Sequence, residues 1–198
     1  MIRRLLLTTA VLALAACDAP EPPPTPAPDP APAPPARPAA DVLTAEGFGP
    51  LRIGMTRAEV ETALGSSSSP EAVGGQDREA CDIFHPARAP QGMTVMVENG
   101  VLTSIWLNSG STLKTDRGFG VGDAATAIKA AYGPTATASP HKYSDAPAEY
   151  ITSWSVGGAP GHVQDPAARG VSYHIGTDGR AERVAAGGPS IQYVEGCA

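Results

Sequence analysis

Two segments of the chain share one helical pattern of apolar residues. Residues 53–65 and 121–133 each read as an apolar residue, a glycine, a helix-start signal, three apolar residues at i, i+3 and i+4, and a final glycine that suits a C-cap. Thr56 with Glu59 predicts a capping box at the first helix, and Asp123 predicts the second N-cap. The spacing puts each trio on one face of a short helix. The trios are Val60, Ala63, Leu64 and Ile128, Ala131, Tyr132.

A hairpin signal lies between residues 93 and 107. Two alternating segments, 93–98 and 101–107, flank Asn99-Gly100, a dipeptide that accepts the positive φ of a type I′ turn. The alternation puts Trp106 on the face opposite the core, together with Met96 and Leu102. The core-facing positions are then Val95, Val97, Val101, Thr103, Ile105 and Leu107.

The predicted elements recur along the chain. Further strands are predicted at 150–156, 171–175, 180–184 and 191–195. Because the two helical segments lie 68 residues apart throughout, we expect a tandem repeat, at 41–112 and 113–198. Each copy would hold one short helix and about three to four antiparallel strands, which implies an α+β fold with the helices on one face of the sheet.

The first helical segment carries a resemblance to a known group of proteins. Gly49-Pro50-Leu51-Arg52-Ile53-Gly54-Met55-Thr56, followed by Glu59 and Val60, resembles the opening of the small lipoprotein of the outer-membrane β-barrel assembly machine. A tandem duplication of such a unit is similar to the β-lactamase inhibitor protein, which belongs to the same broad structural group. Known members are non-catalytic and bind other proteins through sheet or loop surfaces. The resemblance implies a binding module, although no partner-contacting residue can be transferred.

The first residues are typical of an export signal. Arg3 and Arg4 precede an apolar stretch at 5–16 that is too short for a stable membrane span. Leu14-Ala15-Ala16-Cys17 resembles the bacterial lipobox, which implies cleavage after residue 16 and lipidation of Cys17, palmitate among the acyl chains. Several acyl chains give a lasting membrane anchor. We therefore expect a bacterial cell-envelope protein with its domain in the periplasm, and the choice of inner or outer membrane stays open.

Proline and glycine occupy different parts of the chain. Of its 198 residues 21 are proline, and eleven of these lie between Pro20 and Pro38, whereas every glycine lies at or beyond Gly47. Residues 17–40 are therefore expected to form a lipidated, extended Pro/Ala-rich tether.

The net charge is −6, and it becomes −8 once the signal with its two arginines is removed. This balance argues against a nucleic-acid partner, because no basic patch is available to neutralise phosphates.

Lipidation of Cys17 leaves two cysteines in an oxidising compartment. We expect Cys81 and Cys197 to form a disulfide. The alternative is a pair of free redox thiols, and neither cysteine has the Cys-x-x-Cys spacing of such sites.

The sequence holds no recognisable catalytic or metal-binding motif. Its histidines are spaced too widely for a local zinc site, and neither a nucleophile elbow nor a complete phosphate loop occurs. We expect no catalytic residues, no resident metal and no cofactor, so the chain is interpreted as a non-enzyme. The histidines are His85, His141, His162 and His174.

Three aromatic residues are candidates for a binding surface. Alternation aligns Tyr150, Thr152 and Trp154 on one face of a strand, and Trp106 points away from the hairpin core. Trp106, Tyr150 and Trp154 would form an exposed platform for a protein or a glycan; alternatively Tyr150 and Trp154 are core residues and Trp106 covers an interface between repeats.

The leading hypothesis is a protein-binding or assembly module with an envelope partner. The alternatives are a glycan-binding module and a periplasmic hydrolase.

Overall fold

The structure is a computed structural model that describes residues 42–71, 77–159 and 161–197, all within the compact unit Arg37–Ala198. The expected signal at 1–16, the lipidation site Cys17 and the tether at 17–40 lie outside the described residues. None of the helices in the described part of the chain has the length and apolarity needed to cross a bilayer.

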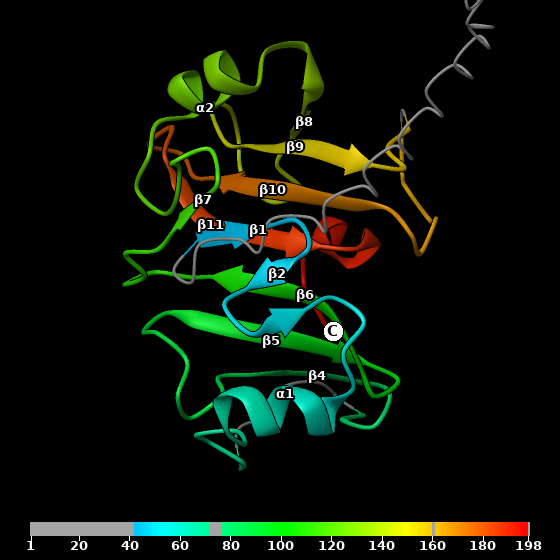
Figure 1. The fold of residues 1–198 in the computed structure, drawn as a ribbon. Helices are drawn as coiled ribbons and strands as arrows, with labels where there is room; N and C mark the ends of the chain where they lie inside the picture. The colour runs from blue at the N-terminus through cyan, green and yellow to red at the C-terminus, as the bar shows by residue number, and fades with distance from the viewer. Residues whose placement is uncertain (1–41, 72–76, 160, 198) are drawn as a thin grey trace, which may run out of the picture. The chain divides into compact units, whose positions relative to one another are not determined.

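A seven-stranded antiparallel sheet forms the body of the fold (Figure 1). Its strand order is β4-β5-β6-β11-β10-β9-β8, so that β6 and β11, which lie far apart in the sequence, are neighbours at its centre. The edges are β4 and β8. The strands are β4 (Cys81–Phe84), β5 (Met93–Glu98), β6 (Val101–Leu107), β8 (Ala136–Pro140), β9 (Glu149–Val156), β10 (Arg169–Ile175) and β11 (Ala181–Gly187).

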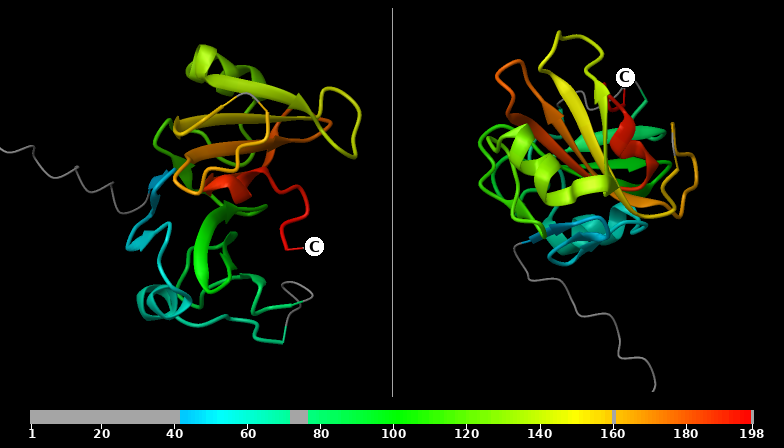
Figure 2. Two further views of the ribbon diagram at one scale, coloured as in Figure 1. Left: turned by 90° about the vertical axis from the view of Figure 1, so that its right-hand side faces the viewer. Right: turned by 90° about the horizontal axis from the view of Figure 1, so that it is seen from above.

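A small second sheet and both α-helices pack on one face of the large sheet. The small sheet has the order β3-β2-β1-β7, and β1 pairs with β7 in parallel. Figure 2 (left) shows this sheet on one side of the large sheet and the C-terminal segment on the other. The main core lies between the two sheets and the helices, and includes Leu43, Phe48, Val60, Ile105, Ile128, Tyr173 and Val184. The small strands are β1 (Val42–Thr44), β2 (Gly47–Phe48), β3 (Leu51–Arg52) and β7 (Lys114–Thr115).

Both helices lie where the apolar trios predict them, but only the first has the predicted N-cap. Helix α1 (Arg57–Leu64) begins with a capping box between Thr56 and Glu59. Helix α2 (Ala125–Tyr132) has Ala124 as its N-cap, without a side-chain hydrogen bond. Asp123 instead accepts hydrogen bonds from Lys114 Nζ (2.6 Å) and the Gly120 amide (2.7 Å). Its carboxylate is therefore occupied by the loop that precedes the helix.

The expected tandem helix-and-sheet repeat is wrong. The described residues are mostly β-structure, with sheets of four and seven strands and only two α-helices, each of eight residues. The strands of 41–112 and 113–198 do not form separate copies, because β6 pairs with β11 in the large sheet and β1 pairs with β7 in the small one. Similar local patterns predicted the individual helices, but pairing between distant strands determined the architecture.

The predicted hairpin is present, but its alternation breaks at a β-bulge. Strands β5 and β6 pair as expected, and Trp106 lies on the face opposite Ile105. The register shifts between Met96 and Val97, so Val97 pairs with Leu102. Leu102 therefore joins the main core, and Val101 is 37% exposed, the reverse of the prediction.

The strand predicted at 191–195 is absent from the described fold. Residues Pro189–Gln192 form a short 3-10 helix, η2, and the segment after it continues along the second face of the large sheet without strand pairing. The neighbouring strand β11 already pairs with β6 and β10 on its two sides. No free edge of β11 is left for another strand.

Candidate functional site

The second face of the large sheet carries a smaller core. Met96, Trp106, Ala185 and Ile191 are buried there, with Trp154 packed against them. Trp106 is only 3% exposed, and its indole nitrogen donates a hydrogen bond to Ser104 Oγ at 2.6 Å. The expected exposed platform therefore cannot include Trp106, which helps to anchor helix η2 and the C-terminal segment to the sheet.

The other two predicted aromatic residues line a cavity on this face. Tyr150 and Trp154 are half-buried, and both border a hollow of about 410 Å³ between strands β8 to β10 and helix η2. Trp154 lies over Gly170, where an added methyl group would be 2.7 Å from Trp154 Cε3. Glycine at this position lets the indole ring rest on the sheet beside the cavity.

Most other side chains around the cavity carry hydroxyl, amide or imidazole groups. Thr152 and Ser172 are cross-strand partners, and their hydroxyl oxygens are 2.9 Å apart. The amide of Gln192 is fixed to Val163 by two hydrogen bonds, of 2.8 and 2.9 Å. The polar lining consists of Thr137, Ser139, Tyr150, Thr152, His162, Ser172, His174 and Gln192.

Strand register puts His174 at the centre of this face. His174 pairs with Tyr150 on β9 and with Arg183 on β11, so the three side chains form a row across the sheet. The Tyr150 ring meets the His174 ring edge-on, with centroids 4.9 Å apart, and His141 stacks on Tyr150 at 4.8 Å. Burial, helped by the nearby Arg183 and His141, lowers the pKa of His174 to about 3.

The chemistry of His174 is that of a neutral imidazole in a packed environment. In the part of the chain that the structure describes, it makes no hydrogen bond to a serine hydroxyl or a carboxylate. Such a bond would be expected of a general base in a hydrolase. The hydrolase alternative gains no support from this histidine.

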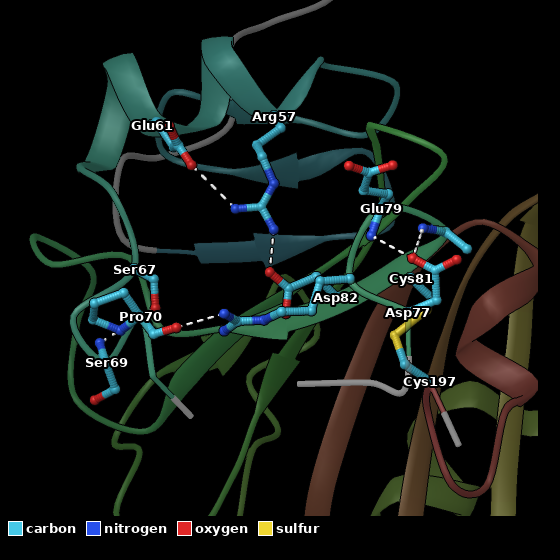
Figure 3. A network of polar contacts seen from close by, with 12 residues as sticks. Arg57, Glu61, Ser67, Ser69, Pro70, Asp77, Glu79, Cys81, Asp82 and Cys197 are labelled. Atoms are coloured by element: carbon cyan, nitrogen blue, oxygen red, sulfur yellow. Dashed lines mark hydrogen bonds and ion pairs between the residues drawn. A yellow bond between two sulfur atoms is a disulfide. The ribbon is translucent and has the colours of Figure 1, made fainter. Parts of the chain in front are cut away.

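The disulfide lies on the same face of the large sheet, at the edge formed by strand β4. Cys81, at the start of edge strand β4, is bonded to Cys197 with an S–S distance of 2.01 Å, the pairing predicted from the sequence. Figure 3 shows the bond beside a polar network around the buried Asp82. Arg57 of helix α1 forms an ion pair with Asp82 and contacts Glu61 at 3.1 Å, and Arg78 lies 3.6 Å from the other oxygen of Asp82. This network ties helix α1 to the edge of the sheet.

The histidines do not assemble into a metal site among the described residues, where no three His, Cys, Asp or Glu side chains are grouped suitably. His85 contacts the Met93 carbonyl through Nδ1 at 2.6 Å, and His162 is exposed on a loop. His141 and His174 share the row around Tyr150. Cys17, the predicted lipidation site, is not among the described residues.

Sequence patterns predict two residues of the cavity, Tyr150 and Trp154. They do not predict His174 and Arg183, the other two members of the cross-strand row. Alternation along one strand was enough to align Tyr150 with Trp154. No sequence pattern distinguishes His174 from the other histidines, and none marks Arg183 as a site residue. Their closeness depends on which strands pair and in what register, and a β-bulge between His174 and Ile175 contributes to that register. One signal could have identified this face of the strand: Ser172 and His174 alternate with apolar residues along it.

Comparisons with known proteins add little to this geometry. No family model matches the sequence, and no curated protein matches it. The crystal structure of a DUF4309 family protein (YjgB) from Bacillus subtilis subsp. subtilis str. 168 matches with a TM-score of 0.42 and 17% identity, over 72% of this chain and 84% of that one. The resemblance to the assembly-machine lipoprotein and the β-lactamase inhibitor protein stays a prediction.

Proposed function

We propose that this chain is a lipid-anchored protein of the bacterial cell envelope whose large sheet binds a glycan without catalysis. The observation that carries the proposal is the cavity of about 410 Å³ that combines Tyr150 and Trp154 with side chains that carry hydroxyl, amide and imidazole groups. Aromatic faces pack against the C–H surfaces of sugar rings, while hydroxyl and amide groups pair with sugar hydroxyls. Among the described residues four large apolar side chains are exposed, Val101, Tyr143, Val156 and Tyr193, which is little material for an apolar protein interface.

The binding test compares glycans on the solubilised mature protein. We expect retention on peptidoglycan or on an immobilised polysaccharide, with a loss of about fivefold or more in affinity for Trp154→Leu, because stacking on an aromatic ring contributes on the order of 1 kcal/mol or more. Tyr193→Ala is the matched control, since Tyr193 is an exposed aromatic residue that does not line the cavity. Unchanged melting temperatures would exclude misfolding, and equal affinity of the Trp154 variant and the wild type would overturn the assignment of this cavity.

The anchor is tested separately. Replacing Cys17 with alanine removes the thiol that accepts the lipid, so the protein should move from the membrane fraction to the soluble periplasmic fraction. Incorporation of labelled palmitate should be lost in the same variant. Membrane association that persists in the Cys17→Ala variant would contradict a lipid anchor at this residue.

A protein-binding role has one observation in its favour. Strand β8 is an edge of the large sheet, and four of its five residues are exposed. An extended segment of an envelope protein could add to this edge through backbone hydrogen bonds. A photoreactive side chain at Ala138 should then crosslink to one defined envelope protein, whereas one at exposed Thr62 on helix α1 should not.

A further inference from the structure

Arg183 is a half-buried cation held in place by neutral groups. Its Nε donates a hydrogen bond to Asn108 Oδ1 at 3.1 Å, and its guanidinium lies 4.7 Å from the centre of the Trp106 ring. Among residues 42–71, 77–159 and 161–197, no carboxylate forms an ion pair with it, and neither terminal nitrogen has a hydrogen-bond partner. The side chain is therefore fixed, with its two terminal amino groups free to bind a ligand.

A cavity of about 380 Å³ adjoins this guanidinium. It is lined by Asn108, His141, Tyr143, His174, Glu182 and Arg183, among others. His174 also lines the cavity beside Tyr150 and Trp154, so this imidazole borders both cavities. Because Tyr150, His174 and Arg183 form one cross-strand row, a ligand that follows the row would reach both cavities.

No carboxylate of the described residues is ion-paired with Arg183 at the second cavity. Desolvation lowers the pKa of Arg183, and the nearby Glu182 opposes that shift. Glu182 is exposed and forms no ion pair with Arg183 in the described structure. The other nearby cation, Lys142, is already paired with Glu195 at 3.0 Å. A partly desolvated guanidinium is stabilised by a carboxylate that accepts two parallel hydrogen bonds.

We propose that Arg183 forms a carboxylate subsite, so that the ligand of this face is an acidic glycan carrying a sugar acid such as a hexuronic acid. The inference rests on the proposed glycan-binding function and adds the charge of the ligand to it. A sugar ring lies in the cavity beside Tyr150 and Trp154, and the carboxylate of that sugar or the next one reaches the terminal nitrogens of Arg183. A sugar is favoured over a peptide because the cavity beside Tyr150 carries several hydroxyl groups that can pair with sugar hydroxyls.

The experiment compares each acidic sugar with its neutral methyl ester. Oligosaccharides of glucuronate, galacturonate and mannuronate are each titrated calorimetrically into the solubilised mature protein, beside their methyl esters and a short peptide with a free carboxyl terminus. We expect the best acid to bind about tenfold or more tightly than its own ester, the gain expected for hydrogen bonds to a charged group. Arg183→Gln and Arg183→Met should abolish that difference and leave the affinity for the ester unchanged. Arg183→Met keeps an apolar stem over Trp106, which guards against a folding artefact.

Arg180→Gln is the control for a general loss of positive charge. Arg180 is exposed, donates to the Gly122 carbonyl at 2.8 Å and does not line the cavity. Its removal should leave the preference for the acid intact. Equal binding of acid and ester, or a preference that survives both Arg183 variants, would overturn the subsite while the glycan-binding function stands. Binding of the peptide alone, or of nothing in the panel, would overturn the sugar-acid assignment, and retention on peptidoglycan or polysaccharide would then decide separately whether the glycan-binding function stands.

Discussion

At the scale of single residues, His174 makes the stability of the fold depend on acidity. Its ordinary pKa of 6.5 falls to about 3 in the folded protein, chiefly because the ring is buried. Between these values the unfolded chain carries a proton that the folded chain lacks, so acidification favours unfolding, by up to about 1.4 kcal/mol per pH unit. The stabilisation is present above pH 6.5 and is lost as the pH falls towards 3. His174→Gln should flatten that loss, measured by urea unfolding at successive pH values.

The measurement on His174 needs a control histidine that lies away from the charged groups around its ring. Arg183 and His141 are the basic side chains beside the ring, and Glu182 is the acidic one in the adjoining cavity. His162→Gln, on an exposed loop, is the matched histidine substitution with which the effect of His174→Gln is compared. If His174→Gln shows the same dependence on pH as the wild type, other groups are responsible for the acid sensitivity.

Sequence reasoning could place residues on a strand face but not beside their neighbours on other strands. Period-two alternation correctly put Tyr150 and Trp154 together. It also put Trp106 on the face opposite Ile105, but it could not show that Ile191 and the chain around Cys197 cover that face. The environment of Arg183 is set by Asn108, which lies 75 residues away in the sequence. Contacts of this range follow from strand pairing, and a single sequence carries little information about it.

At the scale of elements, helix α1 depends on its predicted capping box. Thr56 Oγ1 accepts a hydrogen bond from the Glu59 amide at 3.3 Å, and Glu59 accepts one from the Thr56 amide at 2.8 Å. The Thr56 amide and hydroxyl lower the pKa of Glu59. Thr56→Ala should therefore reduce the free energy of unfolding by about 1 kcal/mol, because Val60 couples the helix to the main core.

Thr62→Ala is the matched substitution in the same helix. Thr62 is exposed, and its hydroxyl donates only to the Ala58 carbonyl one turn earlier, at 2.8 Å. Alanine is the better helix former there, so the free energy of unfolding should stay the same or rise slightly. Equal destabilisation by the two substitutions, compared by chemical unfolding, would show that threonine matters for a reason other than the cap.

Elements with complete local signals were predictable, and those that depend on neighbouring strands were not. The turn at Asn99-Gly100 has φ values of 49° and 79°, the positive values that this dipeptide favours, and the strands on both sides of it are as predicted. The residues at 191–195 alternate like a strand, but β11 is already paired on both sides. Propensity indicates what a segment can form, and the available edges decide whether it does.

At the scale of the whole molecule, long-range pairing joins the two halves of the sequence into one sheet. The local likeness of 53–65 and 121–133 predicted two equal copies, but the large sheet takes three strands from before residue 113 and four from after it. The small sheet crosses the same boundary through β1 and β7. Unfolding should therefore be a single transition for both halves, since neither keeps its sheet neighbours without the other.

The disulfide adds a covalent link across this sheet and gives a final test of that cooperativity. Cys81 and Cys197 are separated by 116 residues, and closing a loop of that length in the unfolded chain stabilises the fold by about 4 to 5 kcal/mol in the loop-entropy account. The double variant Cys81→Ser/Cys197→Ser should lose free energy of that order in urea unfolding, and wild-type protein treated with dithiothreitol should match it. The described residues that follow helix η2 make no strand pairing, so the competing expectation is a local release of this segment. Higher acrylamide quenching of Trp106 with an unchanged unfolding midpoint would favour that local role over stabilisation of the whole fold.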